Sequence, residues 1–321
     1  MLTNSYQSQS INSYRPCQTL FKGCLVALLL VALAACSTNP TQGDQRSQTV
    51  NLKTDQVIVA HRGASGYAPE HTLLAYDLGL TMGAEYIEQD VFPTKDGVLV
   101  CIHDDTLDRT ARGPVENCTG KVSDKTLAQL KTCDMGSWFN EVYPGRAQPE
   151  YVGLQIPTLD EVFARYGTTT NYYIEIKPNS ASLQSVELTL LDLIHEHGLY
   201  QGMVDHHQVL VQSFVPASLQ AMATLDPAVP LIQLARSGSK ADSILAADYA
   251  IGVGPSIKDT NQALVNRAHQ LGLAVHPYTV NSSADLAAAA ALCVDGLFTN
   301  FPDRYREILE TTQLDCPAPI R

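Results

Sequence analysis

The sequence has little positive charge and few aromatic residues. Its 321 residues include 21 Lys and Arg against 33 Asp and Glu, for a formal net charge of -12, and only 1 Trp. A surface of this sign repels phosphate backbones, so we expect no nucleic-acid partner. The rest of the composition, 45% hydrophobic with 20 Gly and 17 Pro, is typical of a packed globular protein and excludes disordered, collagen-like and coiled-coil chains.

The sequence also lacks the motifs of several common enzyme classes. No C-x-x-C occurs, which argues against zinc ribbons and thioredoxin-type redox sites, and no H-E-x-x-H occurs, which argues against metalloproteases. The segment Gly63-Ala64-Ser65-Gly66 lacks the G-x-S-x-G elbow of many serine hydrolases. No G-x-G-x-x-G follows the first apolar run of the domain, which weakens a dinucleotide-binding interpretation.

The N-terminal apolar run, residues 25–33, is too short to cross a bilayer but suits the core of a signal peptide. It ends in Leu33-Ala34-Ala35-Cys36, which resembles a bacterial lipobox. We therefore predict a signal peptide over residues 1–35 and lipidation of Cys36. The alternative is an ordinary signal peptide in which this cysteine is incidental.

The polar stretch after the lipobox indicates where the domain is held. Residues 36–54 contain Asn39-Pro40 and Gly43 and read as a flexible tether between the lipid and the domain. Ser37 favours sorting to the outer membrane. We expect the chain to be exported, to face the periplasm and to touch the membrane only through its lipid anchor.

Export permits disulfides, and five of the eight cysteines lie in the expected domain. Cys118 and Cys133 sit in a polar, turn-rich segment and are the first candidates for a bridge. Cys293 and Cys316 are a second candidate pair, although the sequence does not fix the connectivity. Cys101 lies in an apolar run and is expected to be a buried free thiol.

Eight short runs rich in β-branched and aromatic residues recur along the domain, which we place at residues 55–321. Near-continuous apolar runs suit strands that are covered on both faces, and helical stretches separate most of them. Eight β/α units in about 250 residues predict an α/β protein with a (β/α)8 barrel of the TIM type. A doubly wound open sheet is the alternative. The runs cover residues 57–60, 86–91, 172–176, 209–212, 230–233, 250–253, 274–278 and 296–299.

Two of the separating stretches have clear helical spacing, and Gly272 occupies a C-cap position after the second. We expect each set of apolar residues to share one face of a helix. The sets are Leu183, Val186, Leu190 and Ile194, and Leu264, Ala268 and Leu271.

One long stretch breaks this rhythm. The residues between His103 and Tyr172 are rich in turns and hold only short helical pieces, at 127–130 and 159–163. We interpret most of the stretch, about residues 104–171, as a subdomain inserted at the barrel mouth after the His103 segment.

Charged residues inside predicted strands are the strongest functional signal. Because side chains alternate along a strand, Glu88 and Asp90 share one face, as do Glu175 and Lys177. Three carboxylates that converge at strand ends favour a hard divalent ion, since no cysteine accompanies them. The alternative is a network of salt bridges with Lys177 and Arg62.

Two histidines occupy comparable positions. His61 ends the first strand and His103 ends the apolar run before Asp104. Imidazoles facing each other across a pocket could act as base and acid for transfer at phosphorus, and Arg62 could contact a phosphate oxygen. The alternatives are structural hydrogen bonds for the histidines and an exposed ion pair for the arginine.

These residues belong to a series of short motifs in a fixed order. The first are His61-Arg62-Gly63, Pro69-Glu70-His71-Thr72, Glu88-Gln89-Asp90-Val91, Thr94-Lys95-Asp96-Gly97, His103-Asp104 and Leu107-Asp108-Arg109-Thr110. The later ones are Gly136-Ser137-Trp138-Phe139, Ile156-Pro157-Thr158-Leu159, Glu175-Ile176-Lys177-Pro178, Gln212-Ser213-Phe214, Tyr278-Thr279-Val280-Asn281 and residues 295–303. In order and spacing, the series resembles the signature of the glycerophosphodiester phosphodiesterase family, from about Val57 to Asp303.

The resemblance implies a TIM-type barrel that hydrolyses glycerophosphodiesters, such as glycerophosphocholine and glycerophosphoethanolamine, to sn-glycerol 3-phosphate and an alcohol. It implies a divalent cation, Ca2+ or Mg2+, as the cofactor and a small molecule as the partner; no oligomeric state is predicted. By position, it assigns acid/base roles to His61 and His103, metal ligation to Glu88, Asp90 and Glu175, and substrate binding to Arg62, Lys177 and Glu70.

The sequence departs from the family pattern at three positions. His71, Tyr278 and Asn300 stand where the family often has Asn, Trp and Asp, which bears on substrate preference more than on the chemistry. The sequence is also compatible with two alternative functions. One is a phosphodiesterase of the lysophospholipase D or phospholipase C kind, and the other is a surface lipoprotein that only binds its ligand.

Overall fold

The computed structural model describes residues 56–178, 183–239, 245 and 248–316. The expected signal peptide (1–35), the lipidation site Cys36 and the expected tether (36–54) lie outside these residues. Within the described ranges, no helix combines the length and the apolar character needed to cross a bilayer.

Eight parallel strands form the barrel in the described part of the chain, and each of the eight predicted runs contributes one of them. Their order is β8-β7-β6-β5-β4-β2-β1-β9, and the short strand β3 pairs antiparallel with β2 outside this path. This confirms the (β/α)8 prediction. The bounds are β1 Val57–Ala60, β2 Tyr86–Pro93, β3 Leu99–Cys101, β4 Asn171–Ile176, β5 Val209–Ser213, β6 Leu231–Leu234, β7 Gly252–Gly254, β8 Ala274–Val275 and β9 Gly296–Thr299.

Backbone hydrogen bonds join the two ends of this strand order. The Asp295 N–H donates to the Val275 carbonyl at 3.1 Å. Further along, the Phe298 N–H donates to the Pro277 carbonyl at 3.0 Å, and the Phe298 carbonyl accepts from the Val280 N–H at 2.8 Å. The segments at the two ends of the strand order, β8 and β9, are therefore hydrogen-bonded to each other, as barrel closure requires.

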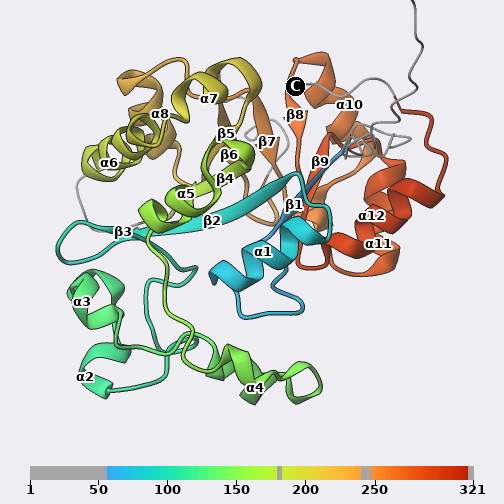
Figure 1. Ribbon diagram of the computed structural model, residues 1–321. Helices are drawn as coiled ribbons and strands as arrows, with labels where there is room; N and C mark the ends of the chain where they lie inside the picture. The colour runs from blue at the N-terminus through green and yellow to red at the C-terminus, as the bar shows by residue number, and fades with distance from the viewer. Residues whose placement is uncertain (1–55, 179–182, 240–244, 246–247, 317–321) are drawn as a thin grey trace, which may run out of the picture. The chain divides into compact units, whose positions relative to one another are not determined.

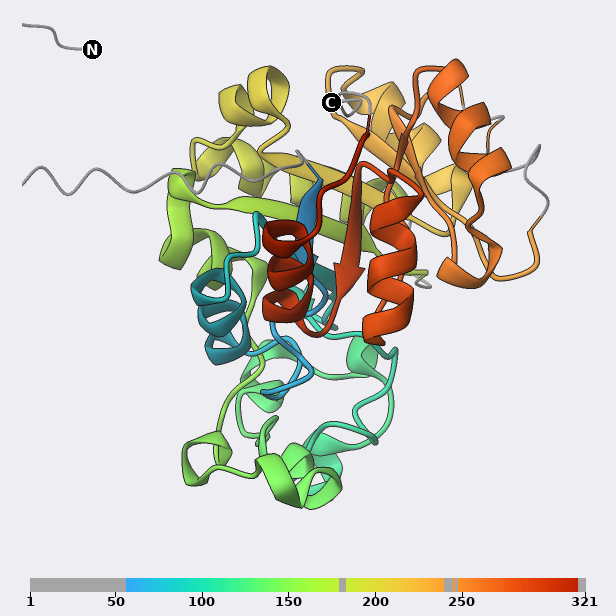
Figure 2. The same ribbon diagram turned by 90° about the vertical axis from the view of Figure 1, so that its right-hand side faces the viewer.

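Helices alternate with the strands and cover the outside of the sheet (Figures 1 and 2). Several begin at a side-chain cap, for example α5, where Thr158 and Glu161 form a reciprocal capping box. The bounds are α1 Leu73–Thr81, α2 Val115–Cys118, α3 Leu127–Leu130, α4 Ser137–Val142, α5 Leu159–Tyr166, α6 Leu183–Glu196, α7 Tyr200–His206, α8 Pro216–Leu225, α10 Gln262–Gln270, α11 Ser283–Ala291 and α12 Pro302–Thr311. Short 3-10 turns lie at Val122–Asp124, Pro144–Arg146, Pro149–Tyr151, Gly167–Thr169 and Ile257–Asp259.

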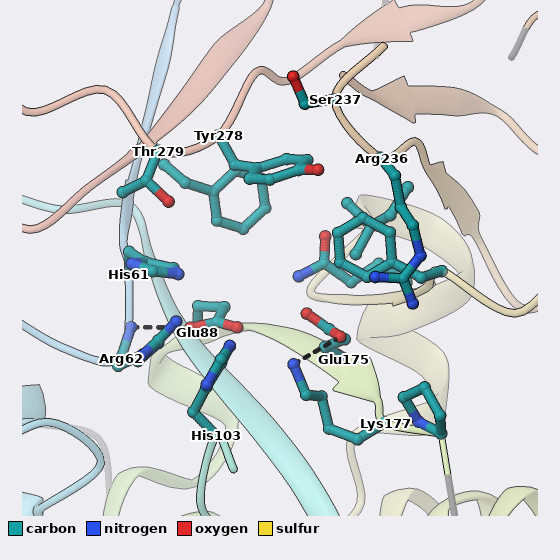
Figure 3. Close-up of a pocket in the computed structure, with 15 residues that line it drawn as sticks. His61, Arg62, Glu88, His103, Glu175, Lys177, Arg236, Ser237, Tyr278 and Thr279 are labelled. Atoms are coloured by element: carbon teal, nitrogen blue, oxygen red, sulfur yellow. Dashed lines mark hydrogen bonds and ion pairs between the residues drawn. The ribbon is translucent and has the colours of Figure 1, made fainter. Parts of the chain in front are cut away.

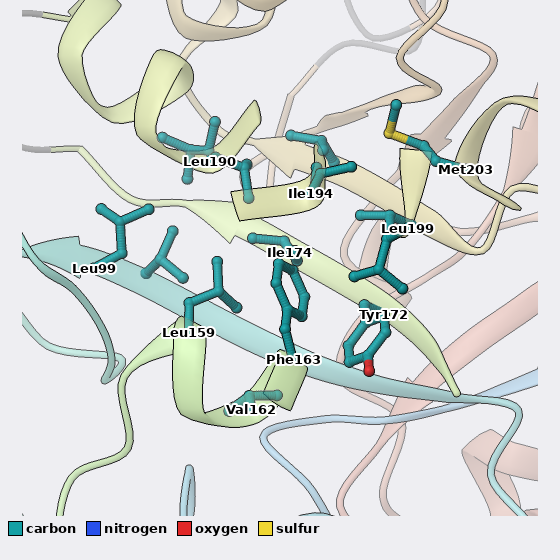
Figure 4. Packing of buried hydrophobic residues seen from close by; sticks show 14 of the residues in the cluster. Leu99, Leu159, Val162, Phe163, Tyr172, Ile174, Leu190, Ile194, Leu199 and Met203 are labelled. Atoms are coloured by element: carbon teal, nitrogen blue, oxygen red, sulfur yellow. The ribbon is translucent and has the colours of Figure 1, made fainter. Parts of the chain in front are cut away.

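The largest apolar cluster lies between strands β2 and β4 and helices α5, α6 and α7 (Figure 4). Leu190 and Ile194, on the predicted face of α6, are fully buried there. Phe163 of α5 packs edge-on against Tyr172 of β4, with ring centroids 4.8 Å apart. Helix α5 thus covers the barrel sheet itself, although it lies in the stretch interpreted as inserted.

The expectation for Leu271 is wrong, whereas those for Leu264 and Ala268 are confirmed. Both of the latter are buried, but Leu271 is 46% exposed. Helix α10 ends at Gln270, and the chain turns at Gly272, which has a φ of +74°. Because the helix stops before the next turn is complete, Leu273, just before β8, takes the buried place instead (8% exposed).

Helices α2, α3 and α4 gather in a subdomain that lies to one side of the barrel in both views (Figures 1 and 2). It has its own apolar cluster, which includes Leu107, Val122 and Leu130. A disulfide between Cys118 and Cys133 closes a loop within it, and a second disulfide joins Cys293 to Cys316. Cys101 is a buried free thiol.

The contrast between two leucines gives a stability prediction. Leu190→Ala should lower the free energy of unfolding by about 2–5 kcal/mol, because it removes buried methyl groups and leaves a cavity. Leu271→Ala makes the same chemical change at an exposed site and should stay within about 0.5 kcal/mol of the wild type. Denaturant unfolding monitored by circular dichroism measures both. Equal losses would contradict the packing described here.

Candidate active site

A cavity of about 490 Å³ opens where the carboxyl ends of the barrel strands converge (Figure 3). Catalytic groups of (β/α)8 enzymes lie at this end of the barrel, because the loops after the strands meet there. Six of the residues predicted from the sequence line it: His61, Arg62, Glu88, His103, Glu175 and Lys177. The other lining residues are Pro178, Gln212, Phe214, Leu234, Arg236, Ser237, Tyr278, Thr279 and Phe298.

Three carboxylates are buried beside one another, and two of them, Glu88 and Glu175, line the cavity. Glu88 and Asp90 come from β2 and are each 1% exposed, and Glu175 of β4, 6% exposed, is the register partner of Asp90. Burial and the charge of Asp90 raise the pKa of Glu88 well above its usual value. The same two causes raise the pKa of Glu175 to about 8, against the opposing effect of Lys177. The three carboxyl groups therefore cannot all ionise readily unless a further cation compensates their charge.

Two cations stand against these carboxylates. The Arg62 backbone N–H donates to Glu88 Oε2 at 2.7 Å, from a residue whose φ is +60°. Arg62 Nε lies 3.4 Å from Asp90 Oδ2. Lys177 Nζ lies 2.9 Å from Glu175 Oε1 and 3.4 Å from Asp90 Oδ1. Burial would raise the pKa of Asp90, but Lys177 and the other neighbours hold it well below its usual value.

The described residues contain one group that could hold a metal ion, formed by His71, Glu88 and Asp90, whose ligand atoms lie within 4.8 Å of one another. His71 uses both ring nitrogens: Nε2 bonds to Asp90 Oδ2 at 2.8 Å and Nδ1 to the Tyr76 hydroxyl at 2.9 Å. It is therefore suited to orient Asp90. Asp90 Oδ1 is buried without a hydrogen-bond partner among the described residues. Buried carboxylate oxygens of this kind fit a hard divalent cation.

The two histidines enter the cavity from the same side (Figure 3) and are each held from behind. His61 follows β1, and its Nδ1 lies 2.7 Å from the acceptor Asn300 Oδ1. His103 Nδ1 lies 2.7 Å from Asp104 Oδ1. In each ring the Nδ1–H donates to this oxygen, which leaves Nε2 free to exchange a proton with a substrate. Burial and the charge of Arg62 lower the pKa of His61 to about 3, so this ring is neutral.

Glu70 and Asp90 do not line the cavity but stand behind residues that do. Glu70 accepts a hydrogen bond from Arg62 Nη1 at 3.0 Å. It also accepts hydrogen bonds from Nη1 and Nη2 of Arg109, at 2.9 and 2.7 Å. Burial alone would raise the pKa of Glu70, but Arg109 and Arg62 lower it to about 2.

Arg109, in the inserted stretch, links the two flanks of the site. Its Nε donates to Asp104 Oδ2 at 2.6 Å, while its other nitrogens hold Glu70. The chain of contacts thus runs from His103 through Asp104, Arg109 and Glu70 to Arg62. The sequence motif contained this arginine but gave it no role.

Sequence reasoning missed part of the cavity wall. Gln212, Phe214 and Tyr278 line it and belong to the quoted motifs. Their place at or just after the carboxyl end of a predicted strand could have indicated that they line the cavity. Arg236 belongs to none of those motifs, and no sequence pattern singled it out. Asn300 was noted only as a departure from the family pattern, yet it holds His61.

A (β/α)8 barrel with paired histidines, clustered carboxylates and cations at its mouth has the groups that phosphodiester hydrolysis needs. The comparisons agree with this class. Residues 61–304 match the glycerophosphoryl diester phosphodiesterase family, and the chain belongs to that family. It is a phosphoric diester hydrolase that acts on glycerophosphodiesters.

The matches with described relatives extend over nearly the whole length of each relative. A glycerophosphodiester phosphodiesterase of Bacillus subtilis is 41% identical over 293 residues, which is 89% of this chain and 98% of the relative. Among solved structures, a putative glycerophosphoryl diester phosphodiesterase of Silicibacter pomeroyi is 25% identical, with a TM-score of 0.70 over 82% of this chain and 95% of that one. A phosphodiesterase of Oleispira antarctica, in complex with the product sn-glycerol-3-phosphate, is 26% identical, with a TM-score of 0.68 over 79% and 97%.

The linking position of Arg109 gives a prediction about catalysis. Arg109→Ala should lower kcat about tenfold or more, because Asp104 and Glu70 lose the group that fixes them and His103 and Arg62 shift. Steady-state kinetics on a glycerophosphodiester measure the loss.

Arg165→Ala is the matched control. Arg165 of α5 donates to Asp77 through Nε at 3.2 Å and Nη2 at 2.6 Å, and neither residue lines the cavity, so its loss removes a comparable ion pair away from the site. It should keep near wild-type kcat. If both variants lost activity equally, the linking role of Arg109 would be refuted.

Proposed function

We propose that the protein hydrolyses glycerophosphodiesters such as glycerophosphocholine and glycerophosphoethanolamine to sn-glycerol 3-phosphate and the free alcohol, by acid/base catalysis of His61 and His103 with a divalent cation. The observation that carries this proposal is the pair of histidines held by their Nδ1 atoms at one cavity. The product bound to the Oleispira antarctica relative supports the choice of product.

Glu88, Asp90 and Glu175 would hold the cation, which is either Ca2+ or Mg2+, with His71 orienting Asp90. When bound, the ion would polarise a phosphoryl oxygen and offset negative charge that develops there. Carboxylate oxygens suit both ions, because both are hard cations. The raised pKa of Glu175 supports the proposal, since a cation would replace the proton that this buried carboxyl otherwise keeps.

The proton steps are assigned to the two histidines. In the first step, one imidazole takes the proton of the glycerol C2 hydroxyl, whose oxygen attacks phosphorus, and the other protonates the departing alcohol oxygen. A cyclic glycerol phosphate results. In the second step, the roles reverse: water loses a proton to one ring and opens the cycle, and the glycerol oxygen regains a proton. Arg62 and Lys177 stabilise the negative charge on the phosphate oxygens.

We also propose that the protein is an exported lipoprotein with Cys36 as its lipidated N-terminus, anchored in the outer membrane and facing the periplasm. The apolar run before Leu33-Ala34-Ala35-Cys36 and the polar tether after it support this location. Two disulfides in the domain are consistent with an oxidising compartment.

The roles of the histidines can be tested by substitution. His61→Ala and His103→Ala should each lower kcat about 100-fold or more, the usual contribution of a positioned acid or base, while the folded circular dichroism spectrum is kept. His195→Ala, in which a ring stacked on Tyr200 is removed from α6, serves as the control and should retain activity. Near wild-type turnover of either active-site variant would remove that histidine from the mechanism.

The metal requirement can be tested on the same substrates. Release of sn-glycerol 3-phosphate from glycerophosphocholine and glycerophosphoethanolamine should stop after EDTA treatment, because the clustered carboxylates lose their counter-charge. Adding back Ca2+ or Mg2+ in separate samples should restore it with the native ion. Full activity in excess EDTA would contradict the metal-dependent mechanism.

A further inference from the structure

The far wall of the cavity carries a cation that the proposed chemistry does not use. Arg236 follows β6 and lines the cavity together with Phe214 and Tyr278, across from His61 and His103 (Figure 3). Its guanidinium carbon lies 5.1 Å from the centre of the Phe214 ring. Among the described residues it forms no ion pair, and its side chain is exposed at the rim. Its charge is therefore available to a ligand.

The ring beneath this guanidinium is fixed in place. Phe214 meets Tyr278 edge-on, with centroids 5.4 Å apart and an interplanar angle of 88°, and the Tyr278 hydroxyl donates to the Ala235 carbonyl at 2.6 Å. Asp259 accepts from the Gly238 N–H, two residues after Arg236, at 2.9 Å. The wall is thus a rigid aromatic surface whose exposed face is covered by a positive charge.

This arrangement bears on the two halves of the substrate. The phosphate must lie within reach of both histidines, so the rest of the cavity receives the glycerol and the alcohol. Gln212 is 2% exposed, and its Oε1 has no hydrogen-bond partner among the described residues. A buried acceptor of this kind suits a glycerol hydroxyl, which every substrate has. The open rim at Arg236 suits the alcohol, whose size and charge vary.

On this basis, and resting on the function proposed above, we propose that Arg236 selects the leaving alcohol and favours alcohols that carry an anionic group, a carboxylate or a phosphate, over purely cationic ones. A guanidinium pairs well with either anion. A choline or ethanolamine head group meets the same positive charge as a repulsion. Aromatic faces attract quaternary ammonium groups, but here the guanidinium already occupies the face of Phe214.

Two substrates that differ by one carboxylate test the proposal. Glycerophosphoserine is glycerophosphoethanolamine with a carboxylate on the alcohol, so the ratio of their kcat/KM values measures recognition of that group. The wild type should prefer glycerophosphoserine by about two- to fivefold, the range of an exposed charge pair. Arg236→Gln should bring the ratio close to one, and Arg236→Glu should invert it.

A second substrate pair separates carboxylate from phosphate recognition. Glycerophosphoglycerol and its derivative with a terminal phosphate on the second glycerol differ by that phosphate alone. A preference for both anionic substrates, lost in Arg236→Gln, means that the site reads negative charge in general. A preference in only one of the two pairs shows whether the carboxylate or the phosphate is recognised. Either result supports the proposal, provided that the preference is lost in Arg236→Gln.

The control is Arg304→Gln. Arg304 lies 3.9 Å from the centre of the Phe301 ring and does not line the cavity, so it is also a guanidinium on a phenyl ring. Its loss should leave both ratios unchanged. If the wild-type ratios are near one, or if Arg236→Gln lowers kcat/KM for all substrates by the same factor, Arg236 does not select the alcohol. If the wild type releases sn-glycerol 3-phosphate from none of them, the proposed function fails instead.

Discussion

The burial of three carboxylates at the ends of β2 and β4 is the constraint on which the rest of the site depends. Removing several like charges from water is costly unless cations and hydrogen bonds compensate. Arg62 is bent into a left-handed conformation that brings its backbone N–H onto Glu88, and Lys177 lies against both Asp90 and Glu175. The left-handed turn at Arg62, just after β1, is needed to form this hydrogen bond to Glu88. The same turn fixes the position of the neighbouring His61.

The inserted stretch completes the other side of the site. His103 and Asp104 lead into it, and Arg109 reaches back from it to Glu70. A barrel loop of ordinary length would have few buried contacts to hold such residues. Here a separate apolar cluster and the Cys118–Cys133 disulfide give the stretch its own core, so its polar side chains can be held against the barrel mouth.

Much of the fold and of the site could be predicted from the sequence, because the signals were local. Alternating side chains placed Glu88 and Asp90 on one face, and apolar runs marked the barrel strands. Leu271 was misjudged because its burial depends on where α10 ends, which periodicity does not show. His71 and Arg236 were given no role because each depends on a partner distant in sequence, Asp90 in one case and Phe214 in the other.

The protein has a net negative charge and acts on an anionic substrate, so the cavity must supply the positive charge that binds it. The protein carries a formal charge of -12 and would repel a phosphodiester at most of its surface. In the site, five carboxylates (Glu70, Glu88, Asp90, Asp104 and Glu175) exceed three cations (Arg62, Arg109 and Lys177) by two formal negative charges, which the proposed divalent cation offsets. A singly charged diester adds one negative charge, a further anionic group on the alcohol adds another, and Arg236 is a cation at the rim that can pair with such a group. The placement of a few cations within the cavity therefore matters more for substrate binding than the net charge of the protein.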